Sequence, residues 1–195
     1  MKRTFDVTVS LVLLVVLLPL LLILALLISL ESNGSVFYRS RRVGLDEREI
    51  TLYKFRTMVP NRDVSGITLG KNDPRITPLG RWLRKYKLDE LPQLVNVLKG
   101  DLSLVGPRPD VPGYNEIYKY YNPDHYKMKP GITSPASIHY FHEGELYQNH
   151  DDPRKEYINR TIPGKVELDR EIRQYTLTDD LRVLVRSLRH MILKH

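Results

Sequence analysis

The longest apolar run in the chain extends from Val7 to Leu30 and contains no charged residue. As an α-helix it would be about 36 Å long, which is enough to cross the hydrocarbon core of a bilayer, about 30 Å thick. The run is longer than the apolar part of a secretory signal peptide, and no small-residue cleavage site follows it. The pattern therefore predicts that residues 1–30 form a membrane segment.

The residues around and within this run indicate how it meets the membrane. Lys2 and Arg3 precede it and three arginines follow within 39–42, so the positive-inside rule places both flanks on the cytoplasmic side. Pro19 removes a backbone donor near the middle and favours a kink. These features predict a re-entrant helix–break–helix, although an ordinary spanning helix that tolerates a proline fits the same residues. Asp6 is expected to pair with Arg3 or another nearby cation at headgroup level.

Two stretches after the turn-rich segment 31–35 alternate in the manner of strands, near 36–43 and 49–58. A strand over the second stretch would direct Lys54 and Arg56 to the same side. Residues 60–75 have the composition of a long loop.

Helical periodicity then begins at Thr77, a good N-cap, with Pro78 at the first helical position. A second helix is expected to begin at Asp89 and to stop at Gly100. Its apolar positions recur with helical spacing, at Leu91, Leu94, Val95 and Leu98.

The remainder of the chain gives weaker signals. Three histidines and two glutamates gather at 139–150, at spacings that match no metal motif, so a polar loop is the better interpretation. They are His139, His142, Glu143, Glu145 and His150. Residues 181–192 carry an apolar stripe with arginines around it, which fits a helix lying on the membrane surface or one packed on the core.

These patterns predict an α+β fold that is mainly helical with a small β element. The expected organisation is a membrane helix over 1–30, re-entrant or spanning, and a domain over 31–195 with a C-terminal amphipathic helix; the resemblance described below implies re-entrance, a catalytic role for the domain and a membrane-surface place for that helix. The chain lacks cysteine, which excludes disulfides and thiolate metal sites. Its net charge of +7 suits an anionic membrane or a phosphorylated substrate. No recognition helix or aromatic-basic platform indicates nucleic acid.

The adjacent acids Asp89 and Glu90 are the strongest candidates for chemistry. Acidic residues at a helix start commonly serve as caps. Two adjoining carboxylates can also hold Mg²⁺ together with a substrate phosphate, and a carboxylate can attack phosphorus to form an acyl phosphate. Arg108, between two prolines, is suited to grip phosphate. Further positive charge is expected from Lys54, Arg56 and Arg84.

Four segments in this order resemble the bacterial sugar transferase family, in particular its small monotopic phosphoglycosyl transferases. They are "KRTFD", "YKFRTM", "LDELPQLVNVLKGDLSLVGPRP" and "KPGIT", and they lie between residue 2 and about residue 133. Residues 134–195 match only loosely. The resemblance implies transfer of a sugar-1-phosphate from a UDP-sugar to polyprenol phosphate with release of UMP. The expected place is the cytoplasmic face of the bacterial inner membrane, at the first membrane step of polysaccharide, lipopolysaccharide or glycoprotein assembly.

The resemblance also implies roles for particular residues. Asp89 matches the nucleophile and Glu90 the neighbour that helps to bind Mg²⁺. Lys54, Arg84 and Arg108 match basic positions of the family, and Pro19 matches the break of its re-entrant helix. The sequence departs from the family pattern at Leu18, where serine is usual, and in "KPGITSPASI", where "KPGITGLAQV" is common.

Two other functions fit parts of the sequence. One is a non-catalytic membrane-anchored binding protein with a basic face, and the other is a bitopic protein with a soluble scaffold domain. The sequence does not identify the sugar that is transferred. It does not fix the oligomeric state either, and a homodimer is one of the states that it allows.

Overall fold

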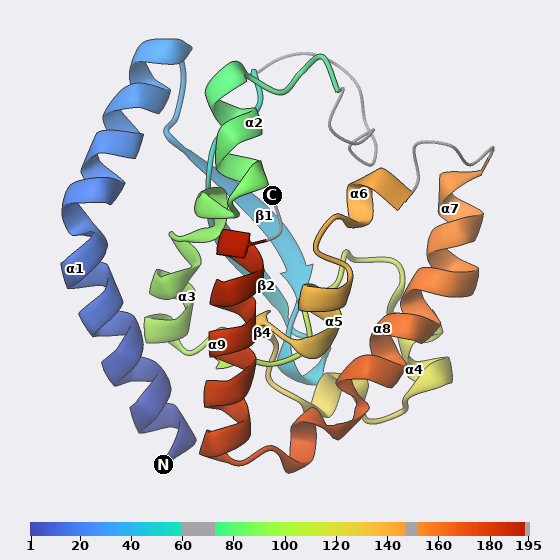
Figure 1. Ribbon diagram of the computed structural model, residues 1–195. Coiled ribbons are helices and arrows are strands. Elements are labelled where there is room, and N and C mark those ends of the chain that lie inside the picture. The colour runs from blue at the N-terminus through green and yellow to red at the C-terminus, as the bar shows by residue number, and fades with distance from the viewer. Residues whose placement is uncertain (60–72, 147–151, 194–195) are drawn as a thin grey trace.

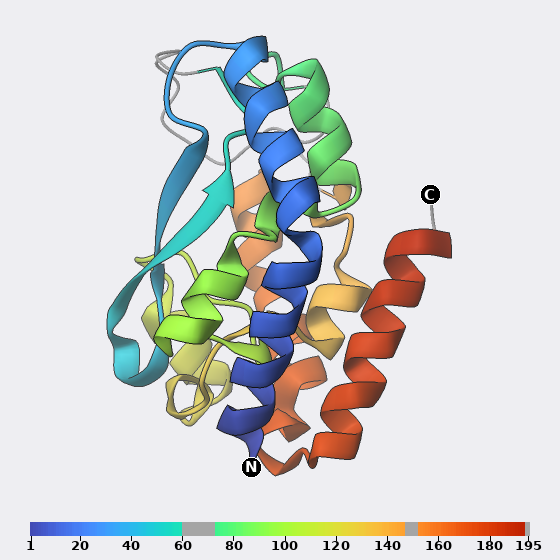
Figure 2. The same cartoon turned by 90° about the vertical axis from the view of Figure 1, so that its left-hand side faces the viewer.

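The structure, a computed structural model, describes residues 1–59, 73–146 and 152–193. Its helices pack against two small β pairs (Figure 1), of which the longer forms an edge of the molecule (Figure 2). The α-helices are α1 (Lys2–Glu31), α2 (Pro78–Lys85), α3 (Gln93–Lys99), α4 (Asn115–Tyr121), α5 (Pro135–His139), α6 (Glu143–Leu146), α7 (Pro153–Glu156), α8 (Ile162–Asp169) and α9 (Leu177–Leu193). Short 3₁₀ turns are η1 (Leu45–Glu47), η3 (Leu88–Glu90), η4 (His125–Lys127) and η6 (Arg170–Gln174), and η5 (Tyr157–Thr161) is a π-helical turn. The predicted class, mainly helical α+β with a small β element, is confirmed.

The predicted strands form an antiparallel hairpin of β1 (Phe37–Val43) and β2 (Glu49–Phe55). Leu52 and Phe55 of β2 are buried, Leu52 in a cluster with Leu94 of α3 and Phe55 in another with Leu83 of α2. The hairpin therefore packs on the helices through both residues. β3 (Ser103–Val105) and β4 (Gly131–Thr133) form a second, parallel pair. This pair places the segments "VGPRP" and "KPGIT" side by side, although they are distant in the sequence.

Backbone contact between these two segments requires glycine. A Cβ atom on Gly131 would lie 2.1 Å from the nitrogen of Gly106, and one on Gly106 would lie 2.4 Å from the carbonyl oxygen of Lys129. Distances below 3.0 Å are not tolerated between such atoms. The two glycines therefore allow the loop after β3, which carries Arg108, to lie directly against β4.

α1 runs past Pro19 as one helix, so the predicted break is wrong as a statement about secondary structure. A proline inside a helix removes one hydrogen bond but is tolerated when packing supports both sides of it. α1 has such support, because it lies lengthwise against the domain (Figure 2). Phe5 and Val9 pack on the cluster that includes Leu94, and Leu24 packs with Leu83.

The outer side of α1 is apolar and exposed. Its large exposed side chains are Leu11, Val12, Leu13, Val15, Val16, Leu18, Leu22, Ile23, Leu26, Leu27 and Leu30. In the part of the chain that the structure describes, α1 is the single helix long and apolar enough to cross a membrane. This surface and the helix length indicate a membrane protein, while re-entrant topology stays a prediction.

Asp6 does not pair with Arg3, so that prediction is wrong. The carboxylate of Asp6 is buried and accepts hydrogen bonds from Ser103 Oγ at 2.8 Å and from the backbone N–H of Leu104 at 3.2 Å. The Arg3 guanidinium instead donates to the carbonyls of Val97 and Leu98, at the C-terminal end of α3. Asp6 faces the protein rather than the headgroups, and it fixes the N-terminal half of α1 to β3.

The helix predicted to begin at Asp89 begins later. Pro92 has no N–H to donate to the carbonyl of Leu88, which accepts instead from Leu91 at 3.3 Å and closes the 3₁₀ turn η3. α3 then starts at Gln93 and ends before Gly100, whose φ of 95° confirms the predicted stop. Thr77 is confirmed as the N-cap of α2, with its hydroxyl accepting from Gly80 N at 2.9 Å.

α9 packs on the core and also leaves an apolar stripe exposed. Val183 is buried, and Ser187 shares a hydrogen bond of 2.9 Å with Thr133 of β4. Asp180 pairs with Lys2 at 2.5 Å, which joins α9 to the start of α1. The exposed stripe consists of Leu181, Val185, Leu188, Ile192 and Leu193. The core-packed alternative thus accounts for one face, and the membrane-surface role of the other stays a prediction.

The region predicted as a polar loop, 139–150, begins at the end of α5 and contains α6, so that prediction is wrong for residues 139 and 143–146. Ser134 caps α5 through its side chain, which accepts from Ser137 N at 3.0 Å. The backbone N–H of Ala136 donates to Asp169 at the end of α8, at 2.9 Å. Burial raises the pKa of Asp169 to about 6 against the effect of this hydrogen bond. His150 lies outside the described residues.

Asp169→Asn is expected to remove a pH-dependent penalty on folding. The pKa of this carboxyl is about 6 in the folded chain and about 3.9 in an unfolded one. The folded state therefore binds more protons, and its stability falls as the pH rises from about 4 to 6. The full effect is at most about 3 kcal/mol. Thermal unfolding measured from about pH 4 to 7.5 should show a decline for the wild-type protein that the variant lacks.

Glu167→Gln, on the exposed part of the same helix, is the matched control and should retain the wild-type pH dependence. If Asp169→Asn gave a curve parallel to that of the wild-type protein, the buried carboxyl would not be the source of the decline.

Candidate active site

A left-handed residue turns the chain into the segment that carries the two acids. Lys87 has φ of 52° and ψ of 21°, a region that non-glycine residues occupy at some cost. Its carbonyl accepts from the N–H of Glu90 at 3.1 Å, which starts η3. The result is a tight turn in which Asp89 and Glu90 are both buried, at 8% and 7% exposure.

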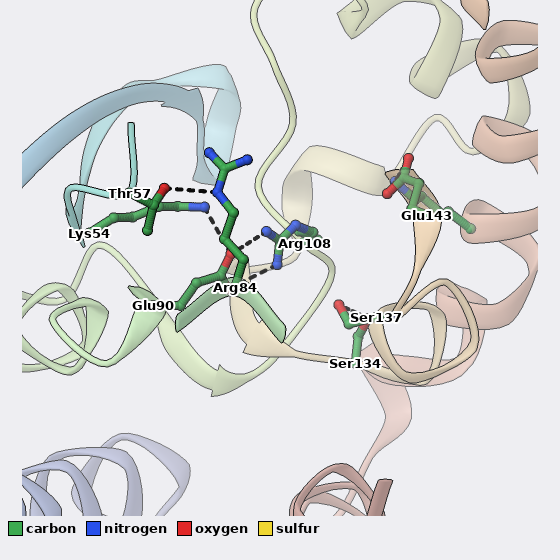
Figure 3. Close-up of polar contacts among 9 residues, drawn as sticks. Lys54, Thr57, Arg84, Glu90, Arg108, Ser134, Ser137 and Glu143 are labelled. Carbon is green, nitrogen blue, oxygen red and sulfur yellow. Dashed lines mark hydrogen bonds and ion pairs between the residues drawn. The ribbon is translucent and has the colours of Figure 1, made fainter. Parts of the chain in front are cut away.

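Glu90 is held by cations from two other segments (Figure 3). Lys54 Nζ, from β2, lies 2.8 Å from Oε1. Arg108, from the loop after β3, donates to Oε1 at 2.5 Å and to Oε2 at 3.1 Å. Burial would raise the pKa of Glu90, but Arg108 and Lys54 outweigh it and hold this pKa well below its usual value. Glu90 is therefore ionised and fully engaged in this cluster.

Asp89 differs from its neighbour because one of its oxygens has no partner. Oδ1 is buried and makes no hydrogen bond within the described parts of the chain. Burial raises the pKa of the Asp89 carboxyl, and the negative charge of Glu90 raises it further. The positive charges of Lys54, Lys87 and Arg84 lower this pKa, but they do not offset the rise. A buried polar atom without a partner is costly and calls for an explanation such as a ligand. Oδ1 of Asp89 is thus the carboxylate oxygen available for chemistry.

Arg84 lies at the end of α2 and donates from Nε to Thr57 Oγ1 at 2.8 Å. Burial lowers the pKa of its guanidinium, and Asp89 is the strongest of the charges that oppose this. Arg84 is therefore close enough to the acids to interact with them and with an anion bound beside them.

Arg56 is not brought together with the other candidates. β2 ends at Phe55, and the guanidinium of Arg56 donates to the last carbonyls of α1 and the turn after it. The distances are 3.2 Å to Ile28, 2.6 Å to Ser32 and 2.8 Å to Asn33. The prediction that Lys54 and Arg56 share a side is wrong, because Lys54 reaches Glu90 while Arg56 caps a helix.

Two further cations near the acids were not predicted. Burial lowers the pKa of Lys87, and the negative charge of Glu90 is the main effect that opposes this. The ammonium of Lys87 lies 4.9 Å from the centre of the Phe141 ring. Arg42 is half-buried, and both burial and the charge of Arg108 lower its pKa. Lys87 precedes Asp89 by two positions, a signal that could have identified it. In the sequence, Arg42 is one of the arginines that follow the apolar run, which indicated membrane orientation and not a place in the site.

The loop that carries Arg108 is held on both sides. The carbonyl of Pro107 accepts from Gly131 N at 2.9 Å, and the carbonyl of Asp110 accepts from Val43 N at 2.9 Å. The carboxylate of Asp110 is bonded to His125 Nε2 at 2.8 Å and to the Tyr126 hydroxyl at 3.2 Å. These buried contacts pre-position Arg108 against Glu90, and sequence reasoning missed Asp110 and His125.

The fit of the site to Mg²⁺ depends on which oxygens remain available. Asp89 Oδ1 is one such oxygen, whereas both oxygens of Glu90 are bonded to cations. Among the described residues, no group of three or more His, Asp or Glu is arranged to hold a metal. The site therefore fits an ion that takes one carboxylate oxygen from the protein and completes its shell with phosphate and water. His139 and His142 lie elsewhere, beside a cavity at α5 and α6.

Taken together, one available carboxylate oxygen lies within a set of buried or half-buried cations. Its members are Lys54, Arg84, Lys87, Arg108 and Arg42. Such a set binds phosphate groups and stabilises negative charge that develops on them.

The chain was compared with known proteins. The family model described as bacterial sugar transferase matches residues 1–194. A Bacillus subtilis protein named "Uncharacterized sugar transferase EpsL" is 44% identical over 71% of this chain and 68% of its own length. "Undecaprenyl-phosphate glucose phosphotransferase" of Komagataeibacter xylinus is 37% identical, over 98% of this chain and 36% of its own length.

"UDP-glucose:undecaprenyl-phosphate glucose-1-phosphate transferase" of Escherichia coli is 35% identical, over 94% of this chain and 38% of its own length. The match thus spans little more than a third of the length of these two relatives. The family match covers almost the whole chain, including Asp89, Glu90 and the cations around them. The family predicted from the four segments is confirmed, and the chain belongs to the bacterial sugar transferases.

Proposed function

We propose that this chain is a membrane-bound phosphoglycosyl transferase that moves a sugar-1-phosphate from a UDP-sugar to polyprenol phosphate through an aspartyl intermediate. The observation that carries the proposal is the buried, unpartnered Oδ1 of Asp89 beside a cluster of cations. The names of the relatives support the substrates, since two of them are undecaprenyl-phosphate sugar phosphotransferases.

In the first step, Asp89 Oδ1 attacks the phosphorus that bears the sugar. A new oxygen–phosphorus bond forms, and the bond from this phosphorus to the bridging oxygen of the diphosphate breaks. The bridging oxygen leaves with the electron pair as part of UMP, and the sugar phosphate remains on Asp89 as an acyl phosphate. The raised pKa of Asp89 makes its carboxylate a more basic nucleophile than an exposed one.

In the second step, a phosphate oxygen of polyprenol phosphate attacks the same phosphorus. The acyl oxygen–phosphorus bond breaks, its electron pair returns to the Asp89 carboxylate, and polyprenyl diphosphate sugar is released. Two steps suit this pair of substrates, because the polar donor and the lipid acceptor then need not occupy the site together.

The neighbouring cations would act mainly through charge and position. Arg84 and Lys87 lie close enough to Asp89 to affect its pKa, so they are placed to neutralise a diphosphate bound there. Glu90 holds Arg108 and Lys54 in place, and its predicted service as a metal ligand would require one of them to give up its bond. Mg²⁺ held by the Asp89 carboxylate would supply further neutralisation of the negative charge on the phosphates.

The same proposal includes the membrane topology. Both ends of α1 pack on the domain, Phe5 near the N-terminus and Ile28 near the C-terminus, which favours entry and exit by one face over a crossing. The cationic residues at both flanks favour the cytoplasmic face of the bacterial plasma membrane. There the site would meet the phosphate of the polyprenol at headgroup level, at the first membrane step of glycan assembly.

Asp89→Asn should abolish transfer, with a loss of at least about 10³-fold in turnover, because the amide cannot form the acyl phosphate. The measurement is intact mass of the wild-type and variant proteins after incubation with UDP-sugar alone. The wild-type protein should gain one phospho-sugar, which polyprenol phosphate then removes, and the variant should gain nothing.

Glu116→Gln, an exposed change on α4, is the control and should behave as the wild-type protein. Near-normal turnover of a folded Asp89→Asn protein would contradict the assignment of the nucleophile.

Arg108→Lys should lower kcat/KM by about 10²-fold, the scale of losing one group that stabilises transition-state charge. Lysine keeps the charge but cannot donate to both oxygens of Glu90, as Arg108 does. Initial rates of UMP release, compared with those of Arg182→Lys at an exposed pair on α9, give the measurement. Equal rates for the two variants would show that the bidentate grip is not needed.

A further inference from the structure

A cavity of about 290 Å³ lies between the α5–α6 region and the C-terminal half of α9, outside the carboxylate cluster. Its described lining includes three imidazoles, those of His139, His142 and His190, together with Tyr140 and Phe141. The volume is close to the lower end of small-molecule sites, roughly 300–1,000 Å³. The cavity is therefore large enough for part of a nucleotide sugar and too small for the whole molecule.

Lys87 joins this cavity to the reacting carboxylate. Its ammonium lies 4.9 Å from the centre of the Phe141 ring, which is part of the lining. The same ammonium is near enough to Asp89 and Glu90 for each to affect its pKa. A ligand whose phosphates lie beside Asp89 therefore has this cavity next to it, with one cation at the junction.

Glu143, a further lining residue, is also in electrostatic reach of the cluster. Its negative charge raises the pKa of Arg108, and in Figure 3 Arg108 stands between Glu90 and Glu143. The carboxylate of Glu143 is bonded to Lys165 Nζ, at 2.8 Å and 2.7 Å. The pair leaves the cavity without a strong net charge, which suits a neutral polar group better than a third phosphate.

The lining favours a flat heterocycle. Phe141 is flanked by His142 and by His190, each with its ring centre 5.0 Å away. Aromatic rings stack favourably on nucleobases, and imidazoles offer donors and acceptors to a base edge. A prenyl chain would need an aliphatic lining, and Leu146 is the single aliphatic side chain among the described lining residues.

We infer that this cavity binds the uracil ring of the UDP-sugar, with Lys87 contacting the diphosphate between the ring and Asp89. The inference rests on the proposed function and assigns a subsite to the nucleoside of its donor.

The test compares binding of UMP and of ribose 5-phosphate, which shares the phosphate and ribose but lacks the base. The wild-type protein in nanodiscs should bind UMP more tightly than ribose 5-phosphate. Phe141→Leu, which removes the flat ring, should weaken the binding of UMP about tenfold and leave the binding of ribose 5-phosphate unchanged. The KM for the UDP-sugar should rise in parallel, while the KM for polyprenol phosphate stays constant. Tyr120→Leu, which removes an exposed aromatic ring on α4, is the matched control.

A second measurement does not depend on a variant that folds. Irradiation of the wild-type protein with 5-iodo-UMP should attach the base to the peptide that contains residues 139–143, and excess UMP should prevent it. Attachment elsewhere would overturn the inference, as would an unchanged ratio of the two affinities in Phe141→Leu or a rise in the acceptor KM alone. A wild-type protein that binds UMP in this way but releases none from any UDP-sugar would instead contradict the proposed function.

Discussion

The buried ion cluster of Glu90 with Arg108 and Lys54 is the interaction on which the rest of the site depends. It joins three segments that are distant in sequence: the hairpin, the turn after α2 and the loop after β3. Breaking such a cluster leaves an uncompensated buried charge, which is far more costly than losing an exposed pair. The cluster also explains why two adjacent acids have different properties. Both oxygens of Glu90 are bonded to cations, whereas Asp89 keeps one oxygen without a partner and has a raised pKa.

Support for this cluster comes from backbone contacts that side-chain patterns do not reveal. Gly106 and Gly131 allow the Arg108 loop and β4 to touch, and Asp110 binds both Val43 and His125. In consequence the guanidinium meets Glu90 from a loop that is fixed by hydrogen bonds on both sides. Pre-positioned charge of this kind costs little reorganisation when a phosphate binds.

The sequence was sufficient for features with a local cause. The alternation of the hairpin, the N-cap at Thr77, the stop at Gly100 and the family segments were all readable, and the structure agrees with them. Features with a tertiary cause were not readable. Lys54 and Arg56 are both basic and only two positions apart, but Lys54 lies beside Glu90 and Arg56 binds the end of α1. They differ because β2 ends between them, at Phe55. Asp6 likewise found partners about a hundred positions away.

The position of Arg56 has a consequence for how the membrane and the reaction centre influence each other. Arg56 grips the last carbonyls of α1, and two residues earlier Lys54 grips Glu90. A displacement of α1 relative to the domain would therefore reach the carboxylate cluster through a short stretch of chain. The position of the long apolar helix and the charge arrangement around Asp89 would in this way be mechanically coupled.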